Sequence, residues 1–401
     1  MIKLITFGCR LNTYESEVIK TFLKDREEDI IIFNSCTVTS EAEKQLRQAI
    51  RKERKENPKA IIGVVGCAVQ TNGEIYKNME EVDFVLGNAD KMKKENYDLI
   101  SKITNIFESN ELAPQIITGF EERTRGFIQI QSGCDNHCTF CATRLARGKS
   151  ISISSQKIIE QINVLVNNGY KEIVLTGIDI TDYGKRLGED INLGKLMKKI
   201  LKETDLPRLK LSSIDIADVN DDLKDVLFNE ERVMPHIHIS LQSGDNTVLR
   251  YMARRHNREQ VIEFCNEIRK YRKNIGIGAD LIAGFPQETE EMHQNSCKLI
   301  QEIGLVYGHI FPYSVRENTP AALMKQVPVD VRRIRARELR ELTNKQLQEF
   351  TKEQMKLPHK ILIESETVGR TENYLNIKLP EKILEKHKVG DIIDYEEAQH
   401  L

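Results

Sequence analysis

Three apolar segments near the N-terminus each lead into a cysteine, and no other feature of the sequence constrains the fold as strongly. The segments cover residues 3–7, 29–33 and 60–65, and they are followed by Cys9, Cys36 and Cys67. Successive cysteines are 27 and 31 residues apart, about the length of one strand and one helix. Strands joined by single crossover helices lie parallel, so their carboxyl ends meet at one edge of the sheet. The repeat predicts an N-terminal parallel-sheet α/β domain with three thiols at the edge where such sheets bind ligands.

These thiols can be interpreted in two ways. Free cysteine often packs as a small hydrophobe, and each of the three could be buried on its own. Their placement after three successive strands favours convergence on a metal instead. We therefore expect Cys9, Cys36 and Cys67 to hold a 4Fe–4S cluster that keeps one iron free of protein ligands.

A second group of cysteines lies in the short run Gly133-Cys-Asp-Asn-His-Cys-Thr-Phe-Cys141. Thiolates at C-x3-C-x2-C, here Cys134, Cys138 and Cys141, can hold three irons of a 4Fe–4S cluster, which takes four cysteines when the protein ligates it fully. The next cysteine in the sequence is Cys265, so one iron is open to a ligand from outside the protein. A zinc site with His137 as fourth ligand is the alternative. His137 directly precedes Cys138, however, and structural zinc ligands usually come in two separated pairs.

Length and composition describe an ordinary soluble protein. The chain has 401 residues, which suggests two or three domains, and is 40% hydrophobic and 30% charged. No apolar stretch reaches the roughly 18 residues of a membrane span, and the first residues resemble a strand rather than a signal peptide, so we expect a cytoplasmic protein without a membrane partner. The eight cysteines are then expected to bind metal or act in catalysis rather than form disulfides. A formal net charge of −2 does not by itself indicate a nucleic-acid partner.

From about residue 125 onward, strand and helix patterns alternate again. Strands are predicted near residues 127–131, 173–175, 209–211, 237–241, 275–282 and 306–311, and helices at residues 155–168, 193–203, 221–228, 258–271 and 289–303. Six such units predict a partial (β/α)6 barrel, about three-quarters of the closed eight-unit form. The Cys134 loop follows the first strand, at the catalytic face of such a barrel. Cys265 and Cys297 lie inside predicted amphipathic helices, where we expect them to pack.

The C-terminal part changes character. A long charged helix is predicted over residues 331–355, followed by strand patterns at residues 359–364, 374–379 and 392–395. This pattern predicts a small all-β barrel. Such barrels often bind RNA, and a purely structural cap is the alternative.

The whole chain is similar to the radical SAM methylthiotransferases. The similarity rests on these stretches: Thr6-Phe-Gly-Cys-Arg-Leu-Asn-Thr-Tyr-Glu-Ser-Glu17, Asn34-Ser-Cys-Thr-Val-Thr39, Val65-Gly-Cys-Ala-Val-Gln70, the Cys134 loop with Ala146-Arg-Gly-Lys-Ser150, Leu241-Gln-Ser-Gly-Asp245, and Asp280-Leu-Ile-Ala-Gly-Phe-Pro-Gln-Glu-Thr289. The resemblance implies an N-terminal methylthiotransferase domain over residues 1–115, a radical SAM domain over residues 120–355 and a TRAM RNA-binding domain over residues 356–401.

The same resemblance implies two 4Fe–4S clusters and S-adenosylmethionine (SAM) as cofactors. In the family, the open iron of the C-x3-C-x2-C cluster binds SAM, whose reductive cleavage yields a 5′-deoxyadenosyl radical, and the second cluster presents the transferred sulfur. An electron donor such as flavodoxin or ferredoxin and a sulfur donor are implied as partners. Polar and glycine residues after the predicted barrel strands are candidates for SAM contacts, although such residues usually mark a turn. They are Thr176, Gly177, Asp179, Ser213, Gln242 and Asp280.

The first cysteine motif, Gly8-Cys-Arg-Leu-Asn12 followed by Tyr14-Glu-Ser-Glu17, is similar to one branch of the family. That branch methylthiolates C2 of N6-threonylcarbamoyladenosine (t6A) at position 37, in the anticodon loop of tRNA. Another branch has Gly-Cys-Gln-Met-Asn and acts on isopentenyladenosine 37 in tRNA, and a third has Gly-Cys-Pro-Lys-Asn and acts on ribosomal protein S12. Both remain alternatives, as does an RNA-binding iron–sulfur protein without catalysis. The stretch Ala142-Thr-Arg-Leu145 departs from the Ile-Ile-Pro-Tyr-like sequence common in bacterial members, which predicts a differently shaped loop beside the cluster.

A threonylcarbamoyl group carries a carboxylate, and arginine pairs with carboxylates in a bidentate way. Arg10 follows the first cysteine, and Arg144 and Arg147 follow the Cys134 loop. We expect these arginines to face the substrate. Alternatively, they neutralise the clusters. An isopentenyl group would leave such an arginine desolvated and unpaired.

Overall fold

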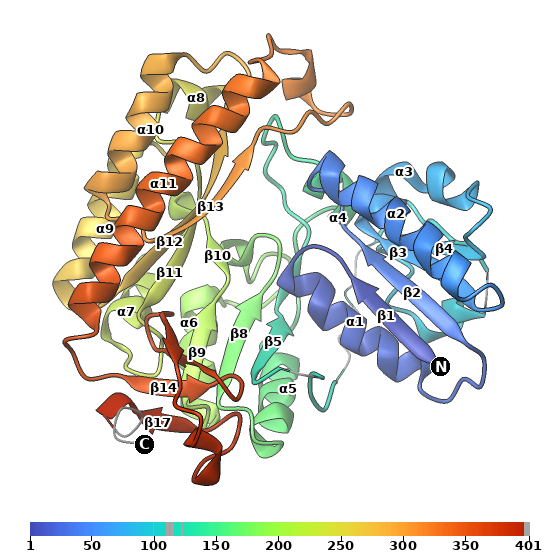
Figure 1. The fold of residues 1–401 in the computed structure, drawn as a ribbon, viewed down its shortest axis with the longest axis horizontal. Coiled ribbons are helices and arrows are strands. Elements are labelled where there is room, and N and C mark those ends of the chain that lie inside the picture. Colours follow the sequence, from blue (N-terminus) through green and yellow to red (C-terminus); the bar gives the residue numbers. More distant parts are fainter. Residues whose placement is uncertain (99, 110–111, 113–115, 122, 397–401) are drawn as a thin grey trace.

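The computed structural model describes residues 1–98, 100–109, 112, 116–121 and 123–396 (Figure 1). The N-terminal part contains β1 (Ile2–Thr6), α1 (Arg10–Leu23), β2 (Ile30–Ser35), α2 (Ser40–Glu56), β3 (Ile61–Gly66), α3 (Cys67–Lys77) and β4 (Phe84–Leu86). The strands pair in parallel, in sequence order. This confirms the predicted parallel sheet. It also adds β4, which is too short to show a recognisable pattern in the sequence.

Helices cover both faces of this sheet. α1 packs through Leu11 and Val18 into a core that includes Ile30 and continues into the central part of the molecule. α2 and α3 pack on the opposite face, in a core that includes Ile31 and Phe33. Neighbouring residues of β2 therefore face different helices, as expected for a parallel strand buried on both sides.

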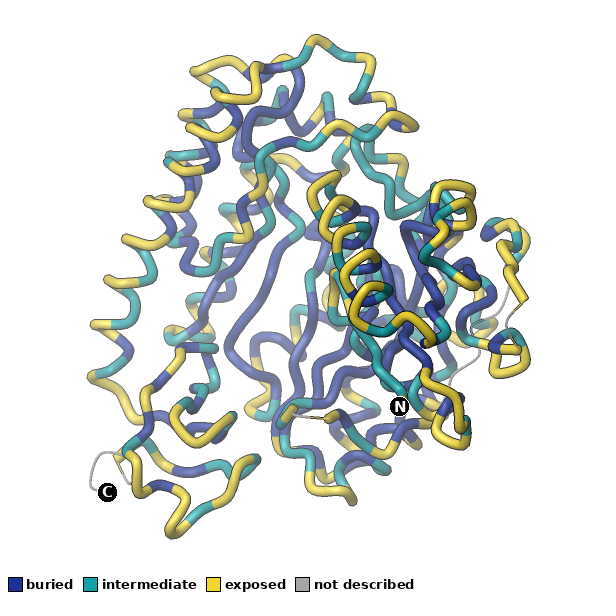
Figure 2. Tube along the Cα trace, turned by 45° about the vertical axis from the view of Figure 1, so that its right-hand side comes forward, coloured by how far each residue is buried: buried dark blue, intermediate teal, exposed yellow. Residues whose placement is uncertain are grey.

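The central part forms the predicted partial barrel. Its principal parallel strands are β5 (Arg125–Gln129), β8 (Glu172–Thr176), β9 (Arg208–Leu211), β11 (His236–Gln242), β12 (Gly276–Ala283) and β13 (Tyr307–Pro312). Backbone hydrogen bonds of Leu209 with Arg232 and Met234 join the β9 side to the β11 side. The principal outer helices are α5 (Ser155–Asn167), α6 (Leu193–Glu203), α7 (Asp221–Asn229), α9 (Arg258–Tyr271) and α10 (Glu290–Glu302). Figure 2 shows the buried strands inside and the exposed outer sides of the helices.

Short elements occupy several of the connecting loops. They are β6 (Gln131–Ser132), β7 (Ile151–Ser152), β10 (Ser213–Ile214), α4 (Thr143–Arg147), α8 (Asn246–Tyr251) and the 3-10 helices η1 (Lys94–Tyr97), η2 (Ile180–Asp182), η3 (Ile216–Asp218), η4 (Pro320–Leu323) and η5 (Ile383–Glu385). The sequence did not predict them, because two to six residues are too few for a hydrophobic period to show.

Polar caps fix the starts of several helices. In each case a side-chain oxygen of the N-cap residue accepts a backbone N–H from the first turn, which leaves that donor satisfied. The N-cap residues are Thr39 (α2), Asn192 (α6), Asn220 (α7), Asp245 (α8) and Asn257 (α9). In the barrel, the caps of α6, α7, α8 and α9 set where the loops before these helices end.

The C-terminal part begins with α11 (Val329–Gln354), which lies against β13 and α10. It is followed by β14 (Lys360–Ile363), β15 (Val368–Thr371), β16 (Asn376–Lys378) and β17 (Ile392–Asp394), which form an antiparallel sheet in the order β16-β15-β14-β17. This confirms a small C-terminal β module, although β15 was not predicted. Across the described ranges of the chain, the helices are too short or too polar to cross a membrane.

The N-terminal sheet borders the open side of the barrel. α1 lies against β5, the first barrel strand (Figure 1). On the other side, Arg316, which follows β13, donates to Thr37 Oγ1 and Glu43 Oε1 at 3.2 and 2.9 Å. The hydroxyls of Ser40 and Ser314 are 2.7 Å apart. Thr37 and Arg316 each follow the carboxyl end of a strand, so the carboxyl edges of the sheet and of the barrel adjoin.

Candidate active site

The cysteines that follow β1, β2 and β3, here named the strand triad, lie at the carboxyl edge of the N-terminal sheet. Cys36 and Cys67 are buried, whereas Cys9 is exposed. Gly8 brings the chain before Cys9 close to Cys36: its φ is +95°, and a Cβ there would lie 2.9 Å from Cys36 Sγ. Only glycine fits such a position without strain. Burial, followed by the neighbouring Cys67 and Cys9 thiols, raises the pKa of Cys36 to about 11.

Two side chains donate to Cys67 Sγ. Asn88 Nδ2 lies 3.3 Å from the sulfur and also donates to the Ala146 carbonyl at 2.7 Å. Arg147 Nε, from the end of α4, lies 3.3 Å from the same sulfur. The strand triad is therefore completed by a residue that follows the other cysteine motif in the sequence.

A buried charge network holds Arg147 in place. Its guanidinium pairs with Glu15 and donates through Nη2 to Asn12 Oδ1 at 2.6 Å. Lys91 Nζ donates to Glu15 Oε2 at 2.6 Å and to Asn34 Oδ1 at 3.0 Å. Burial raises the pKa of Glu15, but Arg147 and Lys91 more than offset this, so the pKa is lowered overall. The network gives physical roles to Asn12, Glu15 and Asn34 of the family-like stretches.

Cys134, Cys138 and Cys141, here named the loop triad, are all partly exposed. Gly133, with φ +74°, precedes the loop, and a Cβ there would lie 1.8 Å from the Lys149 carbonyl oxygen. The Cys134 N–H donates to the Gly148 carbonyl at 3.1 Å, which ties the start of the loop to the end of α4. The Asn136 N–H then points at Cys134 Sγ, 3.4 Å away.

Arg254 is the cation of the loop triad. Its Nη1 donates to Cys138 Sγ at 3.4 Å, and its Nη2 pairs with Asp215 Oδ2 at 2.9 Å. Burial raises the pKa of the Cys138 thiol, and Arg254 acts against this. On the opposite side, Asp179 Oδ2 lies 3.4 Å from Cys134 Sγ. Burial, with the nearby Asp182 charge next in size, raises the pKa of Asp179 to about 6.

Each triad offers three thiols, the ligand type of iron–sulfur clusters. His137, the alternative zinc ligand, is exposed. N–H donors aimed at the sulfurs are contacts that tune iron–sulfur clusters, and binding would release the thiol protons that burial holds on Cys36, Cys134 and Cys138.

The candidate SAM residues lie at different positions along the barrel strands and the loops that follow them. Thr176 ends β8 and Gly177 follows it, and the Ile130 N–H donates to the Thr176 carbonyl at 2.9 Å. Asp179 touches Cys134 as described, Ser213 begins β10, and Gln242 ends β11 with a φ of +69°. Asp280 lies within β12 and pairs with His238 at 3.2 Å. Their contacts with SAM stay a prediction.

The candidate substrate arginines differ more sharply. Within the described residues, the Arg10 side chain makes no hydrogen bond or ion pair. Arg144 stacks over the Phe107 ring, with 5.2 Å between the guanidinium carbon and the ring centre. Arg147 is buried and engaged with Glu15, Asn12 and Cys67. This geometry favours neutralisation of the strand triad for Arg147 and leaves Arg10 available to a ligand.

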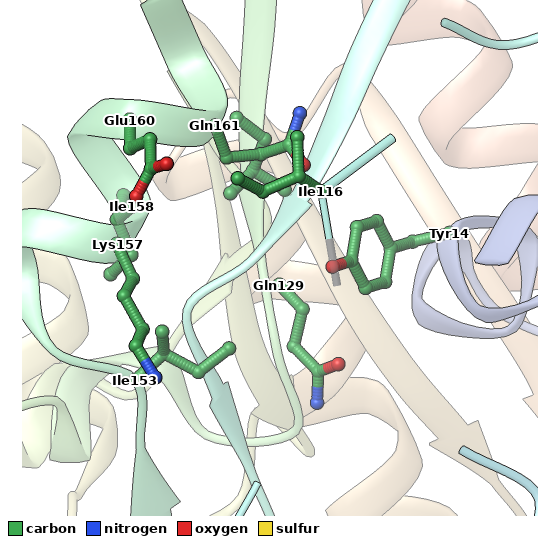
Figure 3. Close-up of a pocket in the computed structure, with 9 residues that line it drawn as sticks. Tyr14, Ile116, Gln129, Ile153, Lys157, Ile158, Glu160 and Gln161 are labelled. Atoms are coloured by element: carbon green, nitrogen blue, oxygen red, sulfur yellow. The ribbon is translucent and has the colours of Figure 1, made fainter. Parts of the chain in front are cut away.

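A separate pocket lies where α1 meets α5 (Figure 3). It is lined by Tyr14, Ile116, Ile128, Gln129, Ile153, Lys157, Ile158, Glu160 and Gln161. None of the six triad cysteines is among these residues, so we place the chemistry elsewhere, at the adjoining carboxyl edges.

Sequence reasoning missed several residues of the site. Asn88 and Lys91 follow the unrecognised strand β4, and Arg254 and Asp215 lie in loops without a motif that we recognised. Asn12, Glu15 and Asn34 did carry a signal, as parts of the family-like stretches. The packing role expected for Cys265 and Cys297 is confirmed, since Cys265 is fully buried in the core and Cys297 packs against it.

Comparison with known proteins places the chain in a family. Residues 128–300 match the radical SAM superfamily, and residues 1–87 match the uncharacterized protein family UPF0004. The threonylcarbamoyladenosine tRNA methylthiotransferase MtaB of Rickettsia prowazekii is 47% identical, over 94% of this chain and 91% of the relative. A tRNA-2-methylthio-N(6)-dimethylallyladenosine synthase of Halalkalibacterium halodurans is 32% identical, over 97% of this chain and 77% of the relative.

Among solved structures, the radical SAM methyltransferase TsrM of Kitasatospora setae, with cobalamin and a [4Fe-4S] cluster bound, has a TM-score of 0.58. The match covers 80% of this chain and 77% of that one at 11% sequence identity, which indicates a shared fold. Fold, cysteine motifs and full-length relatives agree, and the chain belongs to the radical SAM methylthiotransferases.

Proposed function

We propose that this enzyme methylthiolates C2 of t6A at position 37 of tRNA, using SAM and two 4Fe–4S clusters, one on each triad. The names of its relatives support a tRNA substrate, and the motif around Arg10 supports t6A. The observation that carries the proposal is the contact between Arg147 and Cys67, because it supports a site that both triads share.

Chain geometry bounds the distance between the triads. Arg147 lies six residues after Cys141, and residues 143–147 are helical. At about 1.5 Å per helical residue, the backbones of Cys141 and Arg147 are roughly 10 Å apart. The Arg147 side chain then reaches the sulfur of Cys67. This supports a reaction in which groups held on both triads act on one carbon of a single bound base.

When bound, the two clusters would supply the electron that splits SAM and the sulfur that is transferred. The residues around them hold and shield the thiolates. Arg147 and Arg254 place a positive charge beside each triad, at Cys67 and Cys138. Both arginines are also paired with carboxylates, Glu15 and Asp215, so their positions are fixed before a ligand arrives.

We assign tRNA binding to the C-terminal residues, 356–401, and the remaining domains to residues 1–115 and 120–355. Lys378, Lys382 and Lys386 are exposed there and suit the phosphate backbone. An unpaired loop base can be splayed out into a protein site, as entry of adenosine 37 requires. A cytoplasmic location, a flavodoxin or ferredoxin as electron donor and a separate sulfur donor belong to this proposal.

The test is a defined assay with reconstituted enzyme, SAM, a reductant and a sulfur source. We expect methylthiolation of tRNA that carries t6A, and none of tRNA with isopentenyladenosine or unmodified adenosine. Nucleoside analysis of tRNA from a strain lacking this protein gives an independent result, loss of 2-methylthio-t6A.

The alternatives give different results in the same assay. Comparable turnover on the isopentenyl substrate would contradict the t6A assignment. Only the reaction class, methylthiolation of tRNA, would then remain supported. Modification of ribosomal protein S12, with all three tRNAs unchanged, would contradict the tRNA substrate as well.

A further inference from the structure

Lys210, on β9, carries a buried amino group that the fold does not satisfy. It is 2% exposed, and within the described residues its Nζ has no hydrogen-bond partner. Nζ lies 3.0 Å from the centre of the Tyr374 ring, a cation–π contact. A buried ammonium group without an acceptor is strongly disfavoured. Such a group is suited to an anion that arrives from outside the chain.

Tyr374 shows where Lys210 lies. This residue of the C-terminal module accepts a hydrogen bond from Arg125 Nη1, on β5, at 2.8 Å. Its ring centre is 4.7 Å from that of His236, on β11, and 5.9 Å from that of Tyr307, on β13. A ring that contacts β5, β9, β11 and β13 at once lies inside the barrel. Arg125 and His236 begin their strands, so Tyr374 closes the amino end of the barrel interior and Lys210 lies at that floor.

Near Lys210, two basic side chains lack an ion-pair partner within the described residues. Arg125 and Arg370 also lie over the Tyr374 ring, but both pair with Glu364, at 2.9 and 2.8 Å. Arg10 has no such partner within the described part of the chain. Burial lowers the pKa of Lys210 well below its usual value; Glu172 opposes this, and the positive charge of Arg10 lowers the pKa further. The charge of Arg10 therefore acts on Lys210.

Next to this floor the barrel wall is polar and open to solvent. His238 Nε2 and His309 Nδ1 lie 3.2 and 3.4 Å from Asp280 Oδ1, and their rings are 4.6 Å apart, across β11, β12 and β13. The His309 side chain is 59% exposed. A ligand can therefore reach this level, where it meets hydrogen-bonding groups rather than an apolar slot.

We propose that Lys210, together with Arg10, binds the carboxylate of the N6 substituent of the substrate base. The inference rests on the proposed function and names the residues that read its substrate. Five residues of extended chain, about 16 Å, separate Lys210 from Asp215, which holds Arg254 against Cys138. A base bound part of the way between Asp215 and Lys210, with its C2 towards the triads, can direct its N6 substituent towards Lys210. The urea-like linkage then passes the His238, Asp280 and His309 groups.

A second carboxylate is present in the reaction, that of the methionine part of SAM. The experiment separates the two sources by changing the tRNA ligand alone. Substrate tRNA carrying t6A is compared with the same tRNA in which the threonyl carboxylate is a methyl ester. Both are assayed with the wild type, Lys210→Met, Lys210→Arg and Arg10→Met. Lys202→Met, at an exposed lysine of α6, is the control.

We expect the wild type and Lys202→Met to prefer the acid over the ester by about ten- to hundredfold in kcat/KM, the range for one charge-assisted hydrogen bond. Lys210→Met should treat acid and ester alike, with the KM for SAM unchanged, and Lys210→Arg should restore part of the preference. Arg10→Met, on a partly exposed residue, should lose part of the preference even if Lys210→Met does not fold.

Three results would overturn the proposal. If Lys210→Met or Arg10→Met keeps the full acid preference, these residues do not read the substituent. If Lys210→Met raises the KM for SAM and keeps the preference, its partner is the SAM carboxylate. If the wild type does not act on t6A tRNA at all, the proposed function itself is wrong, and this inference falls with it.

Discussion

The two cysteine triads are built in opposite ways, although we expect each to hold the same kind of cluster. The loop triad comes from residues 134–141, and a glycine and backbone hydrogen bonds of that loop set much of its geometry. The strand triad comes from the ends of three strands, and Asn88 and Arg147 complete it from elsewhere in the chain. A local site depends on a short sequence, whereas an assembled site depends on the packing of the whole molecule. The strand triad should therefore be the more sensitive to distant changes.

The largest expected effect separates the triads by function. Replacing Cys134, Cys138 and Cys141 together by Ala should abolish SAM cleavage and reduce the iron content of reconstituted protein from about eight to about four. Replacing Cys9, Cys36 and Cys67 by Ala should remove a similar amount of iron and abolish methylthiolation, while SAM is still cleaved. Iron analysis and detection of 5′-deoxyadenosine measure both. Loss of SAM cleavage in the second variant, with the barrel still folded, would contradict this division.

The next prediction tests the dependence of the strand triad on packing. Arg147→Met leaves the buried Glu15 with Lys91 as its remaining cation, and loss of one partner of a buried ion pair typically costs about 3–5 kcal/mol. The free energy of unfolding, measured with urea on metal-free protein, should fall by that order. Arg144→Met is the matched control on the same helix. Arg144 forms no ion pair within the described residues, and its replacement should cost about 1 kcal/mol or less. Equal losses for both variants would argue against the network.

A smaller effect is expected for tRNA binding, which we place outside both triads. Changing Lys378, Lys382 and Lys386 to Ala should weaken tRNA binding several-fold and reduce its salt dependence, because phosphate contacts release counterions. SAM cleavage without tRNA should remain. These substitutions test tRNA binding more specifically than deletion from His359 onward, because the deletion would also remove Tyr374 from the amino end of the barrel. Unchanged affinity and salt dependence would indicate a structural cap.

The smallest expected effect concerns pH and two glutamates of α1. The pKa of Glu15 is lowered in the folded state, so its ionised form stabilises the fold above the usual pKa of about 4.5, and this contribution is lost as the pH falls below that value. Burial, the largest effect on Glu17, raises its pKa, so ionised Glu17 opposes folding as the pH rises above the same value. Unfolding of metal-free Glu15→Gln should therefore depend less on acid than the wild type, and Glu17→Gln more. The same pH profile in both variants would contradict the two opposite shifts.

Much of the fold could be predicted, because long segments carry their own pattern. The strands of the barrel and the helices between them appear where the hydrophobic periods placed them. The elements that escaped prediction are short: β4 has three residues, β15 four and α4 five. Short elements are stabilised by what they pair with, and a period cannot show in so few residues. The loop triad was predicted for a related reason. Gly133 and the C-x3-C-x2-C spacing belong to one loop, so the pattern is visible in a short stretch of sequence.

What the sequence alone determined was therefore local: the strand and helix order, the loop triad, and the edge at which the strand triad would gather. The tertiary structure decided which distant groups meet there. It turned Arg147 towards Cys67 and Glu15, and it placed Tyr374 of the C-terminal module inside the barrel against Lys210. Nothing near Lys210 in the sequence marks it as buried or unpaired. Burial and charge pairing depend on residues far apart in the chain, so they exist only in the folded protein.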